Sequence, residues 1–167
     1  RDDDLSRGLE MCIRDRSYGD QQDRSTNVKA DHTHWHLHND NKFDVLTNFI
    51  HEKYPQHTIE ELWGCAYRQG DFTQAHTHYS FDRAFVWFVD TSDTCSPLIF
   101  PDPEHLWLPP IHVIKPEKGK IVVFGGLELH YVPPQINGYT RIVMSGNIAL
   151  PQTSAPTDSM FVLNNEG

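Results

Sequence analysis

The sequence predicts an all-β core of the jelly-roll type, also called a double-stranded β-helix, with one or two packing helices near its N-terminal end. Short apolar runs recur from residue 58 onward, and Gly, Pro, Asp and Asn occupy the joins between them. A helical apolar periodicity occurs upstream of these runs. About eight short strands without an internal repeat fit two facing antiparallel sheets.

The expected elements follow in chain order. A helix is predicted over residues 41–54, because Pro55 ends the helical pattern there. Its apolar stripe consists of Phe43, Leu46, Phe49 and Ile50. Strands are predicted over residues 59–67, 72–77, 84–89, 98–100, 112–114, 120–124, 130–132 and 140–148.

Both ends of the chain differ in composition from its middle. Residues 1–17 have alternating charges and no periodicity, and the run 11–16 resembles a translated sequencing adapter, so we expect a disordered or artefactual tail there. The folded domain is predicted to span residues 18–150. Residues 151–167 begin with a Pro/Ser/Thr-rich stretch and are expected to form a C-terminal tail.

Length and charge restrict the class of protein. A chain of 167 residues fits one domain with tails, and a net charge of −9 argues against nucleic acid or an anionic membrane as a partner. The sequence shows neither an apolar run of membrane-spanning length nor a secretory leader. Its three cysteines are widely spaced, which favours reduced thiols and a cytoplasmic location. The oligomeric state is left open, and a homodimer is compatible with the sequence.

Histidines at two places in the chain suggest one metal site. His76 and His78 are two residues apart in an expected strand, so their imidazoles point to the same side. A third ligand has to come from elsewhere, and His130 lies in a second expected strand. Arg141 follows eleven residues later, at the start of an apolar strand. A ligand pair, a distant His and an Arg suit a non-haem iron site that holds an acidic cosubstrate.

A second histidine-rich tract occupies residues 32–38. Four histidines alternate with other residues, so in a strand they would share one face, as in a metal-binding ribbon. The alternative is an edge strand that buries Trp35 and Leu37 and exposes its histidines to water. No carboxylate or Cys joins this tract at ligand spacing, and we expect it to lie outside the catalytic centre.

The motifs together resemble a known family. The matching pattern is Tyr67-x-x-Gly70, His76-x-His78, Gly119 with the apolar run 121–124, His130 and Arg141. Over residues 25–150 the chain resembles the 2-oxoglutarate- and Fe(II)-dependent oxygenases, within them the prolyl-4-hydroxylase-like branch and its small marine bacterial and phage members. The resemblance implies a cupin-like fold, Fe(II), 2-oxoglutarate and O2 as reactants, and hydroxylation of an unidentified small-molecule or peptide substrate.

The resemblance also assigns roles to individual residues. His76, His78 and His130 would bind the metal as the catalytic set, although the family usually has a carboxylate where His78 stands. The open alternative is that Asp82 supplies this carboxylate and His78 lies behind it. Arg141 would bind the distal carboxylate of 2-oxoglutarate. Tyr67 and Ser145 would donate hydroxyl groups to the same cosubstrate.

Two other functions remain compatible with these residues. The first is a three-His cupin dioxygenase or isomerase that does not use 2-oxoglutarate, for which Arg141 would have no purpose. The second is a non-catalytic jelly-roll binding protein, which would leave the three histidines unexplained. We expect Phe81, Phe85, Trp87 and Phe88 to wall the barrel, with some of them serving simply as core residues. Residues 102–110 would form either a lid or a plain surface loop.

Overall fold

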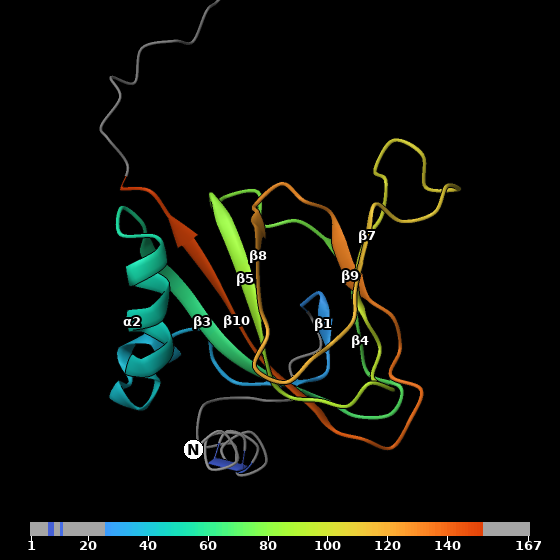
Figure 1. Cartoon of the computed structure of the whole chain (residues 1–167), viewed down its shortest axis with the longest axis horizontal. Helices are drawn as coiled ribbons and strands as arrows, with labels where there is room; N and C mark the ends of the chain where they lie inside the picture. Colours follow the sequence, from blue (N-terminus) through green and yellow to red (C-terminus); the bar gives the residue numbers. More distant parts are fainter. Residues whose placement is uncertain (1–6, 9–10, 12–25, 152–167) are drawn as a thin grey trace, which may run out of the picture.

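Two antiparallel sheets face each other in the computed structural model, which describes residues 7–8, 11 and 26–151. One sheet has the strand order β1-β4-β9-β6-β7 and the other the order β2-β3-β10-β5-β8. Figure 1 shows the helix α2 on the outer side of the second sheet. This arrangement confirms the predicted jelly roll, in which successive strands of the chain cross between two sheets.

The strands and helices have the following bounds. The strands are β1 Val28–Lys29, β2 Asp31–His32, β3 Thr58–Tyr67, β4 Phe72–His76, β5 Arg83–Asp90, β6 Leu98–Phe100, β7 His112–Ile114, β8 Ile121–Gly125, β9 His130–Val132 and β10 Arg141–Ala149. The helical elements are η1 Leu37–Asn39, η2 Asn41–Phe43 and α2 Asp44–Lys53. Each predicted strand agrees with one of β3 to β10 to within one residue at either end, because clusters of Gly, Pro, Asp and Asn form the turns between the strands.

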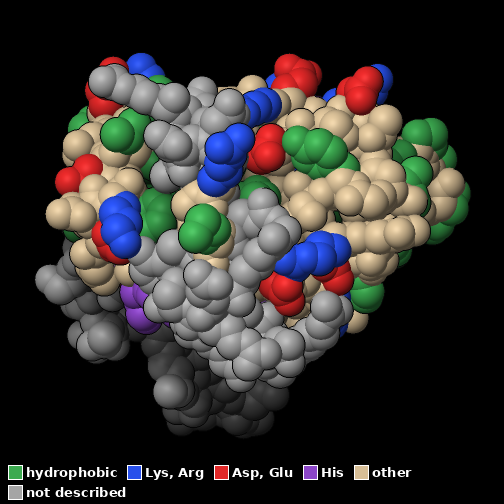
Figure 2. Space-filling view, turned by 90° about the horizontal axis from the view of Figure 1, so that it is seen from below, with side chains coloured by type: hydrophobic (Ala, Val, Ile, Leu, Met, Phe, Trp, Pro, Cys, Tyr) green, Lys and Arg blue, Asp and Glu red, His purple; other side chains and the backbone are tan. Residues whose placement is uncertain are grey.

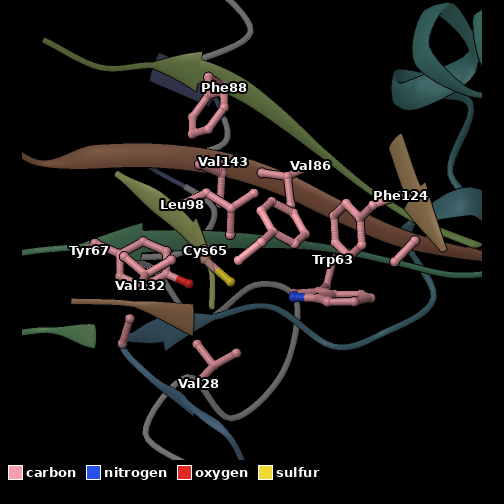
Figure 3. Packing of buried hydrophobic residues seen from close by; sticks show 13 residues of the cluster. Val28, Trp63, Cys65, Tyr67, Val86, Phe88, Leu98, Phe124, Val132 and Val143 are labelled. Atoms are coloured by element: carbon pink, nitrogen blue, oxygen red, sulfur yellow. The ribbon is translucent and has the colours of Figure 1, made fainter. Parts of the chain in front are cut away.

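Side chains of the second sheet alternate between two apolar clusters. Along β10, Ile142 and Met144 belong to an outer cluster with Leu46 and Ile50 of α2. Val143 belongs to an inner cluster between the sheets, which Figure 3 shows around Trp63 and its neighbours. Burying each such side chain contributes roughly 1.5–3 kcal/mol. The alternation holds the sheet in register and leaves its inner face for the site.

The predicted helix is divided into two parts. Residues 41–43 form the short η2, whose first turn is capped by the Asp40 side chain accepting a hydrogen bond from the Lys42 amide at 3.0 Å. The α-helix proper begins at Asp44 and ends at Lys53. Phe49 was predicted to lie in the apolar stripe, but its side chain is 41% exposed, because it lies at the edge of the face that packs on the sheet.

The prediction of an aromatic wall from β5 is wrong for two of its members. Phe85 lies in the outer cluster beneath α2, and Trp87 packs against that cluster. Phe88 lies in the inner cluster as expected. Successive residues of a strand point to opposite faces, so Phe85 and Trp87 cannot share a face with Phe88.

The tract of residues 32–38 is not a continuous strand, contrary to both interpretations of it. Strand β2 ends at His32, and the chain enters η1 at Leu37. His32 is buried, and its ring nitrogen Nδ1 lies 2.7 Å from the Thr33 carbonyl oxygen. Leu37 is buried as expected, whereas Trp35 remains half-buried. Without a regular strand, the four imidazoles do not share one face.

Other surface predictions have mixed outcomes. The connection between β6 and β7 extends away from the sheets (Figure 1), with Trp107 79% exposed, and its role as a lid stays a prediction.

On the described part of the face in Figure 2, basic and acidic side chains lie beside each other and form no continuous basic surface. No helix in the described residues is long and apolar enough to span a bilayer. Apart from residues 7–8, 11 and 151, both predicted tails lie outside the described residues.

Candidate metal centre

Three histidines from different parts of the chain meet between the sheets. His76 ends β4 and His130 begins β9, and the antiparallel pairing of these strands places the two residues opposite each other. His78 lies two residues beyond His76, in a turn where its amide donates to the Gly126 carbonyl oxygen at 2.7 Å. One ligand atom from each ring lies within 4.8 Å of the others, so the predicted convergence is present.

The ring nitrogens have a consistent orientation. Nδ1 of His76 lies 2.8 Å from the Gln74 carbonyl oxygen, and Nδ1 of His130 lies 2.8 Å from the Glu128 carbonyl oxygen. A carbonyl only accepts hydrogen bonds, so Nδ1 carries the proton in both rings and Nε2 keeps a free lone pair. Nε2 of His130 lies 3.3 Å from Nε2 of His78. Backbone carbonyls therefore hold the rings in the tautomer that a metal requires.

Burial keeps these imidazoles uncharged at neutral pH. Desolvation, together with the neighbouring His130 and His76, lowers the pKa of His78 to about 3. Desolvation and the neighbouring His76 lower the pKa of His130 to about 4, and desolvation also lowers the pKa of His76. Neutral imidazole is the form that ligates metals, so the three rings suit a divalent ion without losing protons.

Asp82 does not take part in this group. Its carboxylate Oδ2 accepts a hydrogen bond from the Leu150 amide at 2.5 Å, which holds the side chain at the end of β10. Among the described residues, the cluster able to hold one metal contains His76, His78 and His130 and no carboxylate. The geometry therefore favours the three-histidine set over the alternative with Asp82.

Arg141 is a buried cation without an anionic partner. Its side chain is 1% exposed, and its guanidinium carbon lies 4.8 Å from the ring centre of Tyr67 and 5.4 Å from that of Phe88. Nη1 donates to the Ser96 carbonyl oxygen at 2.8 Å, whereas Nε is buried and has no hydrogen-bond partner in the described part of the chain. No described carboxylate forms an ion pair with it. A buried guanidinium without an anionic partner favours the binding of an acidic ligand.

Tyr67 lies next to Arg141 on the adjacent strand, paired with it directly in the register of β3 and β10. Its hydroxyl forms a hydrogen bond of 2.6 Å with Thr73 Oγ1, and burial raises its pKa, so it stays a neutral donor. Ser145 lies four residues beyond Arg141 on the same strand face, opposite Trp63. All of these residues except Trp63 and Thr73 were predicted as site residues.

One cavity of about 410 Å³, a value that includes its open mouth, connects the histidine cluster with Arg141. Its lining comprises Val28, Trp63, Tyr67, Thr73, His76, His78, Val86, Leu98, His130, Val132, Arg141, Val143 and Ser145. None of these residues is acidic. A divalent metal at the histidines, together with the guanidinium, would give the acid-free cavity two positively charged groups, which favours a small dicarboxylate.

Sequence reasoning missed three residues that support the site. Thr73 faces Tyr67 from β4, three residues before His76, and its strand position was the available signal. Gly126 allows the turn at His78 to approach closely, because a Cβ there would lie 1.9 Å from the Phe81 carbonyl oxygen. Asn147 lies on the same strand face as Arg141, and its Nδ2 donates to the Glu61 carboxylate Oε2 at 2.6 Å.

Comparisons with known proteins extend this description at the level of the fold. No protein-family model and no curated protein matches the sequence. Solved structures do resemble it: a Pseudomonas putida prolyl-4-hydroxylase has a TM-score of 0.63 at 19% identity, covering 89% of this chain and 87% of that one. The chain has the prolyl-hydroxylase fold.

Two further structures with this fold contain the expected cosubstrate. The viral collagen prolyl hydroxylase vCPH from Paramecium Bursaria Chlorella virus-1, in complex with 2-oxoglutarate, has a TM-score of 0.58 at 14% identity over 90% of this chain and 92% of that one. HygX from Streptomyces hygroscopicus, with nickel and 2-oxoglutarate bound, has a TM-score of 0.65 at 8% identity over 86% and 78%. No sequence relative places the chain among marine bacterial or phage members of the family.

Proposed function

We propose that the protein is an Fe(II)- and 2-oxoglutarate-dependent oxygenase that hydroxylates a small-molecule or peptide substrate. The observation that supports this most directly is the acid-free cavity, with three imidazoles on one side and the unpaired guanidinium of Arg141 on another. The presence of 2-oxoglutarate in vCPH and HygX, which share the fold, is consistent with this assignment.

His76, His78 and His130 would hold the metal through Nε2, and Arg141 would bind the distal carboxylate of 2-oxoglutarate. Fe(II), when bound, supplies the oxidation chemistry in which O2 and 2-oxoglutarate are consumed as the substrate is hydroxylated. Three neutral ligands leave the full charge of the ion available to a dianionic cosubstrate. The guanidinium presents a planar fork that a carboxylate can accept bidentately.

The remaining residues of the cavity orient the cosubstrate and exclude water. The Tyr67 hydroxyl is held by Thr73 beside the guanidinium, where it can donate to the same carboxylate. Val132, Val143 and Leu98 close the cavity with apolar side chains. Low local polarity strengthens the interaction between Arg141 and its anion. A cytoplasmic location belongs to the same proposal, since Cys65 and Cys95 are free thiols.

The rival three-His cupin enzyme would need the metal ligands but not the buried Arg. A non-catalytic binding protein would need neither the aligned tautomers nor the lowered pKa values of the three imidazoles. Arg141 therefore decides between the proposal and its first rival, and it provides the experiment.

Replacing Arg141 with Ala should leave Fe(II) binding in place and weaken 2-oxoglutarate binding by on the order of 100-fold, or about 3 kcal/mol, because a buried charge pair is broken. Arg141→Lys should restore only part of the affinity, since one ammonium cannot form two parallel hydrogen bonds. The measurement is a 2-oxoglutarate titration of the anaerobic Fe(II) protein, following its metal-to-ligand absorption band.

A matched control is Arg83→Ala, which removes an exposed Arg at the start of β5 that lies over the Tyr54 ring. This variant should bind 2-oxoglutarate like the parent. Equal affinity of the Arg141→Ala variant and the parent would shift the assignment to the cupin enzyme that does not use 2-oxoglutarate.

A further inference from the structure

A second cavity of about 550 Å³, a value that includes open solvent at its mouth, borders His76 and His78. It shares Val28, Trp63, His76 and His78 with the first cavity but reaches away from Arg141, toward residues 26–27 and the turn 77–81. Its other lining residues are Trp35, Glu61 and Asn147. A molecule in this second cavity would therefore contact the metal-binding histidines while 2-oxoglutarate occupied the first.

The inner face of β3 and β10 joins the two cavities and has opposite charges at its ends. In the register of these strands, Arg141 pairs with Tyr67 and Asn147 pairs with Glu61. Six residues of strand separate the two pairs, or roughly 20 Å. Arg141 lies in the first cavity and Glu61 in the second. The first cavity therefore favours an anionic ligand and the second a cationic one.

Glu61 is held in place but not neutralised. Its half-buried carboxylate Oε2 accepts a hydrogen bond from Asn147 Nδ2 at 2.6 Å, and no described Lys or Arg forms an ion pair with it. The carboxylate interacts electrostatically with His38, but burial lowers the pKa of His38, so that ring is uncharged at neutral pH. The lining of the cavity includes no Lys or Arg. A cation would thus find an unpaired carboxylate there.

Aromatic side chains line the same cavity as this carboxylate. The indoles of Trp35 and Trp63 meet edge to face with ring centres 4.7 Å apart, and Tyr79 and Phe81 also line the cavity. The face of an indole attracts ammonium and guanidinium groups. The net charge of −9 for the whole chain adds a long-range attraction in the same sense.

We propose that the second cavity binds the cationic group of the substrate, an alkylammonium or alkylguanidinium, between Glu61 and the indoles of Trp35 and Trp63. This assignment rests on the proposed oxygenase function and names the substrate class of that site. An amine or guanidine held at Glu61 would extend its carbon chain past Trp63 toward His78, whose ring stacks on that indole with a centroid separation of 6.3 Å. An anionic substrate would meet a like charge at the same place.

The test uses the full chain loaded with Zn(II), which does not support oxidation, and with 2-oxoglutarate. Four probes of matched length are titrated by calorimetry: n-butylammonium, n-butylguanidinium, n-butanol and butyrate. Both cations should bind on the order of tenfold more tightly than n-butanol, with butyrate weakest, as expected for a charge-assisted hydrogen bond. A peptide with a single internal Arg, titrated alongside, shows whether a free cation or a side chain binds better.

Glu61→Gln keeps an acceptor for Asn147 and removes the charge. It should reduce the affinity for both cations by on the order of tenfold, to that of n-butanol. The matched control is Glu60→Gln, since Glu60 is exposed and the neighbouring residue of a strand points to the other face. Thermal unfolding of both variants shows that they are folded.

Three results would overturn the inference: no saturable binding of either cation, butyrate binding as tightly as the cations, or the same loss in Glu60→Gln as in Glu61→Gln. A parallel 2-oxoglutarate titration separates this inference from the oxygenase proposal. If 2-oxoglutarate binds without a preference for cations, only the substrate class is wrong. If cations bind through Glu61 and 2-oxoglutarate does not bind, only the oxygenase proposal is wrong.

Discussion

Two histidine-rich stretches of this protein have the same alternating spacing and different surroundings. At the end of β4, His76 and His78 meet His130, with ring centres 4.3 to 5.1 Å apart. In residues 32–38, the ring centres of His34 and His36 are 6.3 Å apart and those of His36 and His38 are 5.9 Å apart. The described residues at this tract form no group of three ligand atoms close enough for one metal.

The difference comes from what lies opposite each stretch. Strand β9 pairs with β4 and brings a third imidazole to the first pair, and backbone carbonyls fix the tautomers of His76 and His130. In the second stretch, β2 ends at His32, the first of its histidines, and the buried His32 ring contacts the Thr33 carbonyl oxygen. Histidine spacing therefore supplies two ligands at most, and a facing strand decides whether they become a site.

The largest expected effect follows from removing the facing ligand. His130→Ala should weaken Zn(II) or Fe(II) binding by more than about 100-fold, because losing even an outer partner of a ligand costs roughly 10- to 100-fold. Calorimetric titration of the purified protein measures this. The control is His112→Ala, which removes an exposed imidazole from β7 of the same sheet. If both variants bind metal alike, the three histidines are not the metal centre.

A smaller effect should follow from crowding the turn that holds His78. A Cβ at position 126 would lie 1.9 Å from the Phe81 carbonyl oxygen and 2.8 Å from that of His78, so the backbone must shift. Gly126→Ala should destabilise the fold by about 1–3 kcal/mol in urea unfolding and weaken metal binding as well. Gly138→Ala is the matched control, since no atom lies within 4 Å of its added Cβ. Equal unfolding midpoints for the two variants would contradict this account of the turn.

The smallest effect is expected in the tract itself. Replacing His34 and His36 with Ala should change metal affinity and 2-oxoglutarate turnover by no more than about twofold, since neither residue lines either cavity and substitutions away from a site have small effects. His38 is kept, because its ring interacts with the Glu61 carboxylate. His32 is kept, because its buried ring contacts the Thr33 carbonyl and its loss would disturb the fold. Loss of turnover in a variant that is still folded would show that the two stretches act together.

Local chemistry in the sequence determined much of this protein. Clusters of turn residues marked the ends of the strands, because Gly, Pro and Asn together favour turns over extended chain. The spacing of His76 and His78 predicted both rings on one side of a strand, although in the structure β4 ends at His76 and the contact with Gly126 positions His78. The resemblance to the oxygenases drew attention to His130, Arg141 and Tyr67, and the structure brings all three to one cavity.

Pairing between distant strands decided what the sequence left open. It placed Glu61 opposite Asn147, brought Thr73 to the Tyr67 hydroxyl and held Asp82 away from the histidines at Leu150. These contacts depend on register and on which strands are neighbours, and neither is encoded in the spacing of residues along one segment. The sequence alone therefore determined the strands and the ligand types, whereas the tertiary structure determined which groups share a cavity and which charged side chains line each one.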